Sequence, residues 1–528
     1  MSRILVVGGA GYVGSTTCVH LLDEGHEVWV LDDLSTGHRH LVAVDQDHFI
    51  FGRAGDTKLV EQLVTSERFD CVMHFAARSL VEESFVHAEA YYENNVQQTE
   101  ALLEILLKHD LKNFIFSSTC AVYEKTLDGV SAIPESFPKD PATPYGKTKL
   151  EVENRLSRLA RERGLRALAL RYFNAAGAET KLRVGEWHEP ETHLIPRILG
   201  ILGNSGNEPD APMTIYGSDY STPDGTCVRD YIHVSDVAEA HIAAMKRLLG
   251  SGLPVKGTYE AFNLGSGRGY SILEIIAVAE KILGRKIKTQ VGERRVGDVP
   301  RLVADTTLAQ RELGFGPGTG PETVKKLRNI EEILMSAWAW EQKRRKIKRP
   351  AIFLDRDGTL NEDPGYLNDP TKVKLLPGVA EGLVKLRSCG YLLVIVSNQS
   401  GVGRGRIEPE ALVKVNKRLD ELLSQSGVYI DEYKLCLHVP DVACECRKPK
   451  PKMILDAAEM LNIDLSRSYM IGDRKSDLLA GTAAGCKGSI LVKTGLSAEV
   501  TDTSKVSYVG DSILQISDWI LNQENANS

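Results

Sequence analysis

The chain has 528 residues, of which 42% are hydrophobic and 26% are charged. This composition is that of an ordinary globular protein and excludes disorder over most of the length. The 64 Lys and Arg residues against 71 Asp and Glu residues give a net charge of -7, so no global basic field favours nucleic acid as a partner. No apolar run in this sequence reaches membrane-spanning length, and we expect no secretory leader, because the first apolar run reaches glycine too soon. The length predicts about three to four folding units in a cytoplasmic enzyme.

Apolar runs that end in glycine or aspartate predict buried parallel strands. Ile4–Val7 ends at Gly8, and Ala351–Leu354 ends at Asp355. The carboxyl ends of such strands are where open α/β sheets bind ligands. Between these two runs, strands alternate with helices, which predicts an α/β fold class. We expect strands at Glu27–Leu31, Cys71–Phe75, Asn113–Ser117 and Ala167–Arg171, and helices at Thr99–His109 and Leu150–Arg163.

The segment Trp338–Pro350 loses apolar periodicity and contains six basic residues. An anion-binding patch is one interpretation, and a solvated helix end with an interdomain linker is the favoured one. We therefore predict an α/β domain over residues 1–175 with contributions from later segments, and a looser substrate lobe over residues 176–340. A basic linker follows over 341–349, and a second α/β domain over 350–528.

Glycines at positions 8, 11 and 14 follow the first strand and precede a helical segment. Glycine there permits a tight turn and lets backbone N–H groups approach a pyrophosphate at the helix N-terminus. Asp32 ends the next strand, where a carboxylate binds ribose hydroxyls and would repel a 2′-phosphate. Together these features predict a Rossmann domain that binds NAD rather than NADP.

Tyr145 and Lys149 lie four residues apart on one face of a helix. A phenol ordinarily titrates near pH ~10. A neighbouring ammonium and a positive nicotinamide ring would favour the phenolate and make Tyr145 a base near neutral pH. A surface Tyr/Lys pair without function is the alternative. The upstream glycines and the hydroxyl cluster Ser117–Thr119 at a strand end argue against it.

The segments GGAGYVGS, SSTCAVY, PYGKTK, LRYFNAAGA, ETHLIP and DGTCVRDYIHV occur in this order over residues 1–340. They resemble the extended short-chain dehydrogenase/reductases, and among them the UDP-glucose (UDP-galactose) 4-epimerases. The resemblance implies that Tyr145 removes the 4-OH proton of a UDP-sugar while hydride passes to NAD. The 4-keto sugar then turns over and takes the hydride back on its other face. Thr119 would hold the 4-oxygen, and Lys149 would tune Tyr145 and hold the nicotinamide ribose.

The same resemblance implies two larger sets of residues. The NAD contacts would be Gly8, Gly11, Tyr12, Val13, Gly14, Asp32, Asp33, Phe75, Ala76, Asn94, Tyr145, Lys149 and Tyr172. The UDP contacts would be Asn174, Leu194, Arg229, Arg295 and Asp298. Departures from the family pattern at the cofactor side leave NAD binding open, namely Arg53, Asp33, Ser79, Glu82 and Glu124. Leu302, of middling size, leaves open whether the sugar carries a 2-acetamido group.

The second apolar strand leads into Asp355-Arg-Asp357-Gly-Thr. One of these carboxylates could attack phosphorus and the other protonate the leaving oxygen, with Mg²⁺ bound beside them. Ser397, Lys448 and Asp473 follow in the order that phosphoryl transfer requires, as a hydroxyl, a cation and a further carboxylate.

These motifs resemble the haloacid-dehalogenase (HAD) phosphatases over residues 349–525. The resemblance implies that Asp355 is the phosphorylated nucleophile and Asp357 the general acid/base. Mg²⁺ would bind Asp355, the Asp357 carbonyl and Asp473. The substrate contacts would be Ser397, Asn398, Arg447 and Lys448.

Cys436, His438, Cys444 and Cys446 place four soft or borderline ligands within eleven residues. This spacing predicts a closed structural zinc site whose loop leads into Arg447 and Lys448. The six other cysteines are predicted to be reduced core thiols. The loop, Gly365–Leu367 and the runs SNQSGVGRG and CRKPKP resemble D-glycero-D-manno-heptose 1,7-bisphosphate 7-phosphatases. Histidinol-phosphate phosphatases share the loop, and Tyr366 with CRKPKP favours the heptose enzymes.

The sequence thus predicts a bifunctional carbohydrate enzyme for surface polysaccharide precursors such as lipopolysaccharide. Its partners would be small molecules, with no nucleic acid and no membrane, and the epimerase resemblance implies a homodimer. The alternative is that only the phosphatase is active and the N-terminal part is a non-catalytic nucleotide-sugar-binding module.

Overall fold

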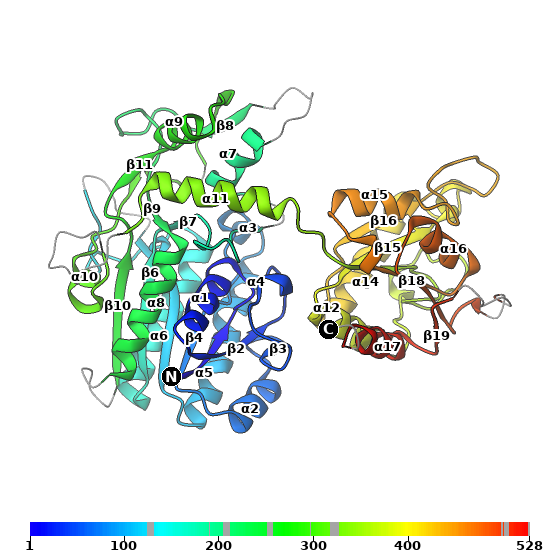
Figure 1. Cartoon of the computed structure of the whole chain (residues 1–528), viewed down its shortest axis with the longest axis horizontal. Helices are drawn as coiled ribbons and strands as arrows, with labels where there is room; N and C mark the ends of the chain where they lie inside the picture. Colours follow the sequence, from blue (N-terminus) through cyan, green and yellow to red (C-terminus); the bar gives the residue numbers. More distant parts are fainter. Residues whose placement is uncertain are drawn as a thin grey trace. The chain divides into compact units, whose positions relative to one another are not determined.

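The computed structural model describes residues 1–123, 131–188, 191–203, 212–250, 257–295, 297–316, 327–497, 500 and 506–525. Glu124 therefore lies outside the described residues. The chain divides into two compact units, Met1–Arg344 and Arg345–Ser528, and both are of the α/β class (Figure 1). No helix in the described part is long and apolar enough to cross a bilayer.

The first unit is built on a seven-stranded parallel sheet in the order β10-β6-β5-β4-β1-β2-β3. The order reverses between β1 and β4, and ligands bind at such a switch point in open α/β sheets. The strands are β1 (Arg3–Val7), β2 (Glu27–Asp32), β3 (Phe49–Phe51), β4 (Cys71–His74), β5 (Asn113–Thr119), β6 (Arg166–Tyr172) and β10 (Thr258–Leu264).

Alternate residues of each strand face two different hydrophobic cores. Ile4 and Val6 of β1 pack with one pair of helices, whereas Leu5 and Val7 pack with a set of three helices on the other face. The pair is α1 (Tyr12–Asp23) and α8 (Val234–Leu249), which lie over the near face of the sheet in Figure 1. The set of three is α2 (Thr57–Ser66), α5 (Gln98–Lys108) and α6 (Pro144–Arg163).

Residues after 175 build a smaller lobe and also return to the main sheet, since β10 and α8 belong to it. The lobe contains β7 (Asn174–Ala176), β8 (Met213–Tyr216), β9 (Val228–His233), β11 (Gly269–Ser271), β12 (Thr289–Gly292) and β13 (Arg301–Leu302). Helices α7 (Leu194–Gly203), α9 (Ile272–Leu283) and α11 (Ile330–Arg344) share a separate core. The shorter elements of the first unit are α3 (Val81–Val86), α4 (Ala88–Tyr92), α10 (Thr307–Leu313), η1 (Arg39–Leu41), η2 (Glu93–Gln97) and η3 (Cys120–Tyr123).

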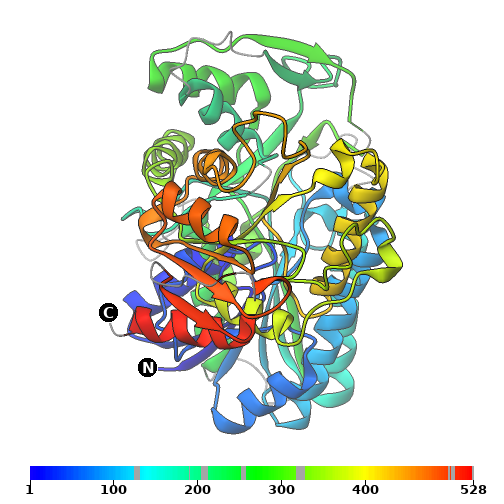
Figure 2. The same ribbon diagram turned by 90° about the vertical axis from the view of Figure 1, so that its right-hand side faces the viewer.

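The second unit has a six-stranded parallel sheet in the order β16-β15-β14-β17-β18-β19, and Figure 2 turns it toward the reader. The strands are β14 (Ala351–Leu354), β15 (Leu392–Asn398), β16 (Glu432–Cys436), β17 (Tyr469–Gly472), β18 (Gly488–Val492) and β19 (Tyr508–Gly510). Helices α12 (Val379–Ser388), α14 (Pro409–Ser424) and α17 (Ile513–Asn525) cover one face. Helices α15 (Lys452–Met460) and α16 (Lys475–Ala484) cover the other, and short turns complete the unit at α13 (Ser400–Gly403), η4 (Pro370–Lys372) and η5 (Leu465–Arg467).

The predicted α/β class is confirmed, and every predicted strand forms within one or two residues of its expected bounds. One helix begins earlier than the predicted Leu150, because α6 starts at Pro144. The Thr143 hydroxyl caps it by accepting the Gly146 N–H at 3.0 Å, and proline is well suited to a first helical turn. The earlier start places Tyr145 and Lys149 inside the helix.

A buried ion pair fastens α6 to β6. Glu153 accepts hydrogen bonds from the Arg171 Nε at 2.8 Å and Nη2 at 2.5 Å, and both side chains are 2% exposed. The Ser118 hydroxyl donates to Glu153 at 2.6 Å and the Tyr259 hydroxyl at 2.9 Å. Because its partners come from β5, β6 and β10, Glu153 joins the helix to neighbouring strands of the sheet.

We predict that Arg171→Met lowers the free energy of unfolding of the first unit by about 3–5 kcal/mol, because it leaves a buried carboxylate without its cation. Tryptophan fluorescence during urea unfolding measures this, since Trp519 is the only one of five tryptophans outside the first unit. The matched control is Arg163→Met at the exposed pair with Glu104, with an expected loss below about 1 kcal/mol. Equal losses in the two variants would contradict the importance of the buried pair.

Candidate active sites

The glycine turn after β1 leaves no room for side chains. Gly8 has φ +83°, and a Cβ there would lie 2.3 Å from the Ala76 backbone nitrogen. A Cβ on Gly14 would lie 2.1 Å from the Gly8 carbonyl oxygen. Gly11 precedes α1 and offers no side-chain cap, so the first amides of the helix are directed to a ligand or water. The turn therefore has the shape of an anion cradle.

Asp32 fastens this turn to the end of β2. Its Oδ2 accepts the Ala10 N–H at 2.9 Å, and its Oδ1 accepts the Leu34 N–H at 2.8 Å. Burial raises the pKa of Asp32 to about 7, and the nearby Asp33 carboxylate adds to the shift. Arg53 lies beside Asp33, with Nε 3.6 Å from its Oδ2. Arg53 and Asp33 both depart from the family pattern, and their opposite charges thus offset each other.

The structure brings Thr119, Tyr145 and Lys149 together in a buried cluster. Thr119 ends β5, while Tyr145 and Lys149 lie in the first two turns of α6, and none is more than 9% exposed. Lys149 Nζ donates to the Ser117 carbonyl at 2.9 Å and lies 6.0 Å from the centroid of the Tyr145 ring. The cluster therefore contains a phenol, a hydroxyl and an amine at one strand end.

Burial controls the protonation of this cluster. It raises the pKa of the Tyr145 phenol well above its ordinary value, and the neighbouring Thr119 hydroxyl offsets only part of the rise. Burial also lowers the pKa of Lys149 to about 7, partly opposed by the Glu153 carboxylate. In the ligand-free chain, desolvation therefore opposes the phenolate. The expectation that Lys149 and a positive nicotinamide ring together favour the phenolate concerns the NAD-bound chain and stays a prediction.

The other predicted cofactor residues surround the same strand ends. Phe75 and Ala76 directly follow β4, and Tyr172 ends β6, where its hydroxyl pairs with Ser117 at 2.8 Å. Asn94 lies in the π-helical turn η2, and its Nδ2 donates to Asn95 at 3.0 Å. Tyr12 and Val13 open α1, and Ser79 is exposed between β4 and α3.

Two of the predicted nucleotide contacts pair with each other. The Arg229 Nη2 lies 3.1 Å from Asp298, and Nη1 donates to the Val299 carbonyl at 2.8 Å. Arg295 lies over the Tyr216 ring at 4.0 Å, and its Nε is 3.2 Å from Glu82. Glu82, which departs from the family pattern, thus contacts Arg295, a predicted UDP contact. Asn174 lies in β7, Leu194 begins α7 and Leu302 is buried in β13.

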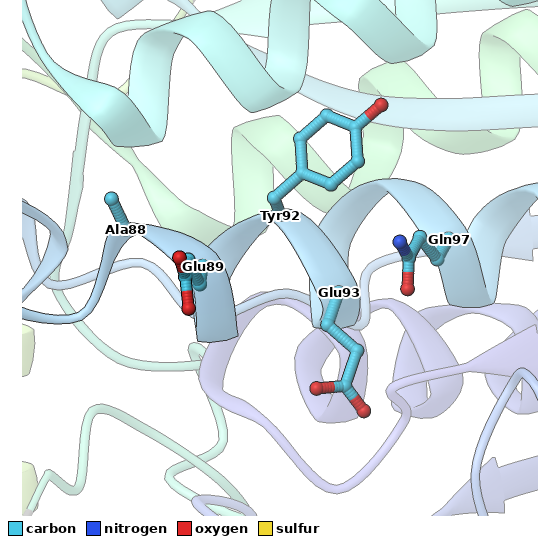
Figure 3. Close-up of a pocket in the computed structure, with 5 residues that line it drawn as sticks. All are labelled: Ala88, Glu89, Tyr92, Glu93 and Gln97. Atoms are coloured by element: carbon cyan, nitrogen blue, oxygen red, sulfur yellow. The ribbon is translucent and has the colours of Figure 1, made fainter.

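A surface hollow on α4 and η2 has a volume of about 460 Å³ and is lined by Ala88, Glu89, Tyr92, Glu93 and Gln97 (Figure 3). The Tyr92 ring and the Glu93 carboxylate point to opposite sides of the helix (Figure 3). None of the lining side chains is a predicted site residue. The hollow is therefore not where the chemistry of the first unit is expected.

In the second unit, a buried lysine meets two carboxylates. Lys448 Nζ lies 2.7 Å from Asp355 Oδ1 and 2.7 Å from Asp477 Oδ1, and it donates to the Val396 carbonyl at 2.6 Å. Burial alone would lower the pKa of Lys448, but the two carboxylates hold it above its ordinary value. Lys448 is therefore a fixed cation beside Asp355.

Asp355, Asp473 and Asp477 form a group whose carboxylate oxygens lie within 4.8 Å of one another. Asp473 Oδ2 accepts the Leu496 N–H at 2.7 Å, while the buried Oδ1 has no hydrogen-bond partner among the described residues. Burial raises the pKa of Asp473 to about 7. Clustered carboxylates with an unsatisfied oxygen fit a divalent cation such as Mg²⁺.

Asp477 was not assigned a role from the sequence. Besides contacting Lys448, its Oδ2 accepts the Arg474 N–H at 3.0 Å and so caps the start of α16. Its place in the run Gly472-Asp-Arg-Lys-Ser-Asp477, where an acid follows a strand end and opens a helix, was the available signal.

Asp357 is held by three neighbours. Arg356 makes a two-pronged contact to it at 3.0 and 2.7 Å, Gln399 donates at 2.8 Å and Asn361 at 2.9 Å. Burial would raise the pKa of Asp357, but the Arg356 guanidinium and these hydrogen bonds hold it below its ordinary value. Asp357 is therefore a carboxylate in the ligand-free chain.

The remaining predicted phosphatase residues take different places. Ser397 is buried at the end of β15, where its hydroxyl accepts from Gln399 at 3.0 Å. Asn398 pairs twice with the backbone of Lys448, at 3.1 Å in each direction. Arg447 donates to the His438 carbonyl at 3.2 Å. Asn398 and Arg447 thus position the backbone around Lys448. The sequence analysis gave Asn398 only as a substrate contact and did not indicate this positioning role.

The nine cysteines all lie in the described part of the chain and form no disulfide, and three of them converge with a histidine as predicted from their spacing. Cys446 Sγ lies 3.3 Å from Cys436 Sγ and 3.3 Å from His438 Nδ1. Cys436 lies 3.8 Å from Cys444 and 3.7 Å from His438. Zn–S bonds of about 2.3 Å in a tetrahedron require ligand separations of roughly 3.7 Å. The donor set and spacing therefore fit zinc.

In comparisons with known proteins, each of the two units matches a different family model. The model of the NAD dependent epimerase/dehydratase family matches residues 4–265, and a HAD-hydrolase-like model matches residues 445–516. A UDP-glucose 4-epimerase of Halalkalibacterium halodurans is 42% identical over 340 residues, which are 64% of this chain and 95% of that protein. The chain belongs to the NAD-dependent epimerase/dehydratase family. Beyond the family's part, it carries a C-terminal HAD-like domain.

Solved members of the epimerase/dehydratase family cover the same part of the chain. The UDP-glucose 4-epimerase of Brucella ovis in complex with NAD has a TM-score of 0.57 and 39% identity, and covers 64% of this chain and 98% of its own. The UDP-glucose 4-epimerase from Bifidobacterium longum in complex with NAD⁺ and UDP has a TM-score of 0.57 and 32% identity, and covers 65% of this chain and 98% of its own. The second unit is thus an addition to the length of these relatives.

We predict that Lys448→Met lowers the free energy of unfolding of the metal-free second unit by about 3–5 kcal/mol, because Asp355 and Asp477 lose their buried cation. Lys450→Met removes an exposed cation paired with Glu445 and should cost less than about 1 kcal/mol. Thermal unfolding followed by circular dichroism in EDTA compares the two variants. Added Mg²⁺ should restore part of the stability lost in Lys448→Met. An equal loss in the two variants would refute the assignment of Lys448 as the buried cation that pairs with Asp355 and Asp477.

Proposed function

We propose that the first unit is an NAD-dependent UDP-sugar 4-epimerase, with UDP-glucose and UDP-galactose as its substrates. The observation that carries the proposal is the buried cluster of Thr119, Tyr145 and Lys149 at the end of β5. Relatives named as UDP-glucose 4-epimerases at about 40% identity support it. The structure of a relative with NAD⁺ and UDP supports the same choice of ligands.

The chain's own residues fit NAD. The cradle formed by Gly8 and Gly14, which a Cβ would fill, would take the pyrophosphate beside the start of α1. Asp32 would face the adenosine ribose from the end of β2, and Lys149 the nicotinamide ribose. When bound, NAD would supply the hydride acceptor and a positive ring that favours the Tyr145 phenolate.

Tyr145 would take the proton from the sugar 4-hydroxyl and return it after the sugar has turned over. Thr119 would hold the 4-oxygen during both steps, because its hydroxyl lies beside the phenol. Arg229 would pair with the diphosphate, since its guanidinium supplies a fixed positive charge among the predicted nucleotide contacts. Asn174, Leu194, Arg295 and Asp298 would complete the nucleotide site, and a homodimer is part of the proposal.

For the second unit we propose a Mg²⁺-dependent sugar phosphatase, with D-glycero-D-manno-heptose 1,7-bisphosphate as its substrate. Asp355 would attack phosphorus, while Ser397 and Lys448 hold the phosphoryl oxygens. Mg²⁺, held by Asp355, Asp473 and the Asp357 carbonyl, would neutralise charge on the transferred group. Asp357 rests as a carboxylate, so an arriving phosphate dianion would raise its pKa and enable it to protonate the leaving oxygen.

The loop of Cys436, His438, Cys444 and Cys446 supports this proposal. Zinc bound there would fix the loop, and Arg447 would transmit that order through its contact with the His438 carbonyl. Arg447 then stands beside Lys448, where it would meet a second phosphate or the sugar. Histidinol phosphate is the alternative substrate, because related phosphatases share this loop.

A second candidate assigns catalysis to the phosphatase alone, with the first unit binding a nucleotide sugar. The observation that favours it is the contact between Glu82 and Arg295 at 3.2 Å, which engages a predicted UDP contact. The Thr119, Tyr145 and Lys149 cluster argues against it. Conversion of UDP-galactose by the purified chain decides between the two, and no product with added NAD would refute the epimerase.

We predict that Tyr145→Phe lowers epimerisation by about 10²–10⁴-fold, because the proton acceptor is lost, and leaves phosphate release unchanged. Asp355→Asn should abolish phosphate release and leave epimerisation unchanged, because the nucleophile is lost. Each variant is thus the control for the other. The measurements are formation of UDP-glucose from UDP-galactose and release of phosphate from heptose, hexose and histidinol phosphates. Loss of both activities in either variant would contradict two independent sites.

We also predict that Cys446→Ser removes about one zinc per chain and lowers phosphatase activity by about 10–100-fold, because the loop beside Lys448 loses its metal. Cys486→Ser is the matched control, since Cys486 lies in the apolar core packed against α15 and α16. Metal analysis and phosphate release measure the two effects. Equal zinc content in both variants would overturn the zinc assignment.

A further inference from the structure

A second group of potential metal ligands lies in the first unit, in the loop between β7 and α7. Glu186, His188, Glu191 and His193 each offer one ligand atom, and these four atoms lie within 4.8 Å of one another. The residues follow the pattern Glu-x-His-x-x-Glu-x-His. None has a role in the mechanism proposed above.

The distances within this Glu/His group are those of a coordination shell. His193 Nδ1 lies 3.0 Å from Glu191 Oε1 and 3.2 Å from Glu186 Oε1. His188 Nδ1 lies 3.4 Å from Glu186 Oε1 and 3.7 Å from Glu191 Oε2. A tetrahedral zinc with bonds of about 2.1 Å to nitrogen and oxygen separates its ligands by roughly 3.4 Å. These four nitrogen–oxygen distances, which involve both oxygens of Glu191, lie on either side of that value.

Ordinary ion pairs explain only part of the group, in which His193 Nδ1 and Glu191 Oε1 lie at hydrogen-bond distance, 3.0 Å. The two imidazole rings lie with centroids 4.7 Å apart, so both would be cations side by side if each paired with a carboxylate. The Nδ1 of His188 faces two carboxylates at 3.4 Å (Glu186 Oε1) and 3.7 Å (Glu191 Oε2), which is longer than an ordinary hydrogen bond. A ring nitrogen directed at two carboxylates from such distances is oriented as a metal ligand would be.

We propose that Glu186, His188, Glu191 and His193 bind one Zn²⁺ ion in a closed, structural site. Two neutral imidazoles and two carboxylates suit this borderline cation, and the two negative charges neutralise it. All four ligands come from the protein, which is the pattern of structural rather than catalytic zinc.

The ion would hold together a junction of three elements. The Trp340 Nε1 of α11 donates to the Glu186 carbonyl at 2.9 Å. The Tyr12 ring, next to the glycine turn, lies edge-on to His188 with centroids 6.2 Å apart. His193 directly precedes Leu194, the first residue of α7. Zinc here would therefore fix the loop against α1 and α11 and set where α7 begins.

Cobalt titration of the full-length protein tests the proposal, because thiolate ligands give an intense sulfur-to-cobalt charge-transfer band and imidazole with carboxylate does not. After removal of metal with EDTA, the protein is titrated with Co²⁺ from a chelator-buffered solution. We expect an equivalent of tetrahedral cobalt that binds without adding to the charge-transfer band. In the Cys446→Ser variant this equivalent should remain.

His188→Ala should lose this thiolate-free equivalent and keep the charge-transfer band. The matched control is His48→Ala, because His48 also faces a carboxylate, Asp45, at 2.6 Å but lies outside the Glu/His group. Equal cobalt binding in the two variants would overturn the proposal. If His188→Ala does not fold, titration of the unchanged chain decides. A chain whose only tetrahedral cobalt shows thiolate charge transfer has no second zinc-type site, because cobalt at the oxygen ligands of Asp355 and Asp473 would be octahedral, and this result leaves the proposed epimerase and phosphatase untouched.

Discussion

The buried pair of Glu153 and Arg171 fixes where helix α6 lies against the sheet, and the chemistry of the first unit depends on that position. Two turns before Glu153 along α6 is Tyr145, and one turn before it is Lys149. Because Glu153 also bonds to groups on β5 and β10, the helix meets the strand that ends in Thr119. The same carboxylate opposes the loss of positive charge on Lys149. One ion pair thus controls both geometry and electrostatics.

The second unit also depends on buried ionic contacts, but there a lysine lies among carboxylates, whereas in the first unit the carboxylate of Glu153 is bound by an arginine. Asp355 and Asp473 at strand ends meet Asp477 in the first turn of α16, and the buried cation Lys448 makes the proximity of these three carboxylates tolerable. Asn398 and Arg447 hold the backbone that carries Lys448, so the cysteine loop and the end of β15 both contribute to its placement. In both units, anionic substrates would meet a few buried cations, which is why a chain with net charge -7 needs no basic field.

Strands and ligand-binding turns could be predicted from the sequence because they are local: an apolar run followed by glycine or aspartate defines each of them, as at Gly8 and Asp355. Partnerships between distant residues could not be predicted in this way. Asp477 meets Lys448, and Glu82 meets Arg295, only after the chain folds. The burial of Tyr145, which opposes its ionisation in the ligand-free chain, could not be predicted for the same reason, because it arises from tertiary packing.

The central claim is that the first unit moves a hydride from C4 of a UDP-sugar and returns it to the same carbon. The most direct test is to incubate the purified chain with UDP-galactose deuterated at C4 and to analyse the product by mass spectrometry. We predict UDP-glucose that retains deuterium at C4, because the hydride never exchanges with water. Product that has lost the deuterium to solvent, or no product even with added NAD, would contradict the account.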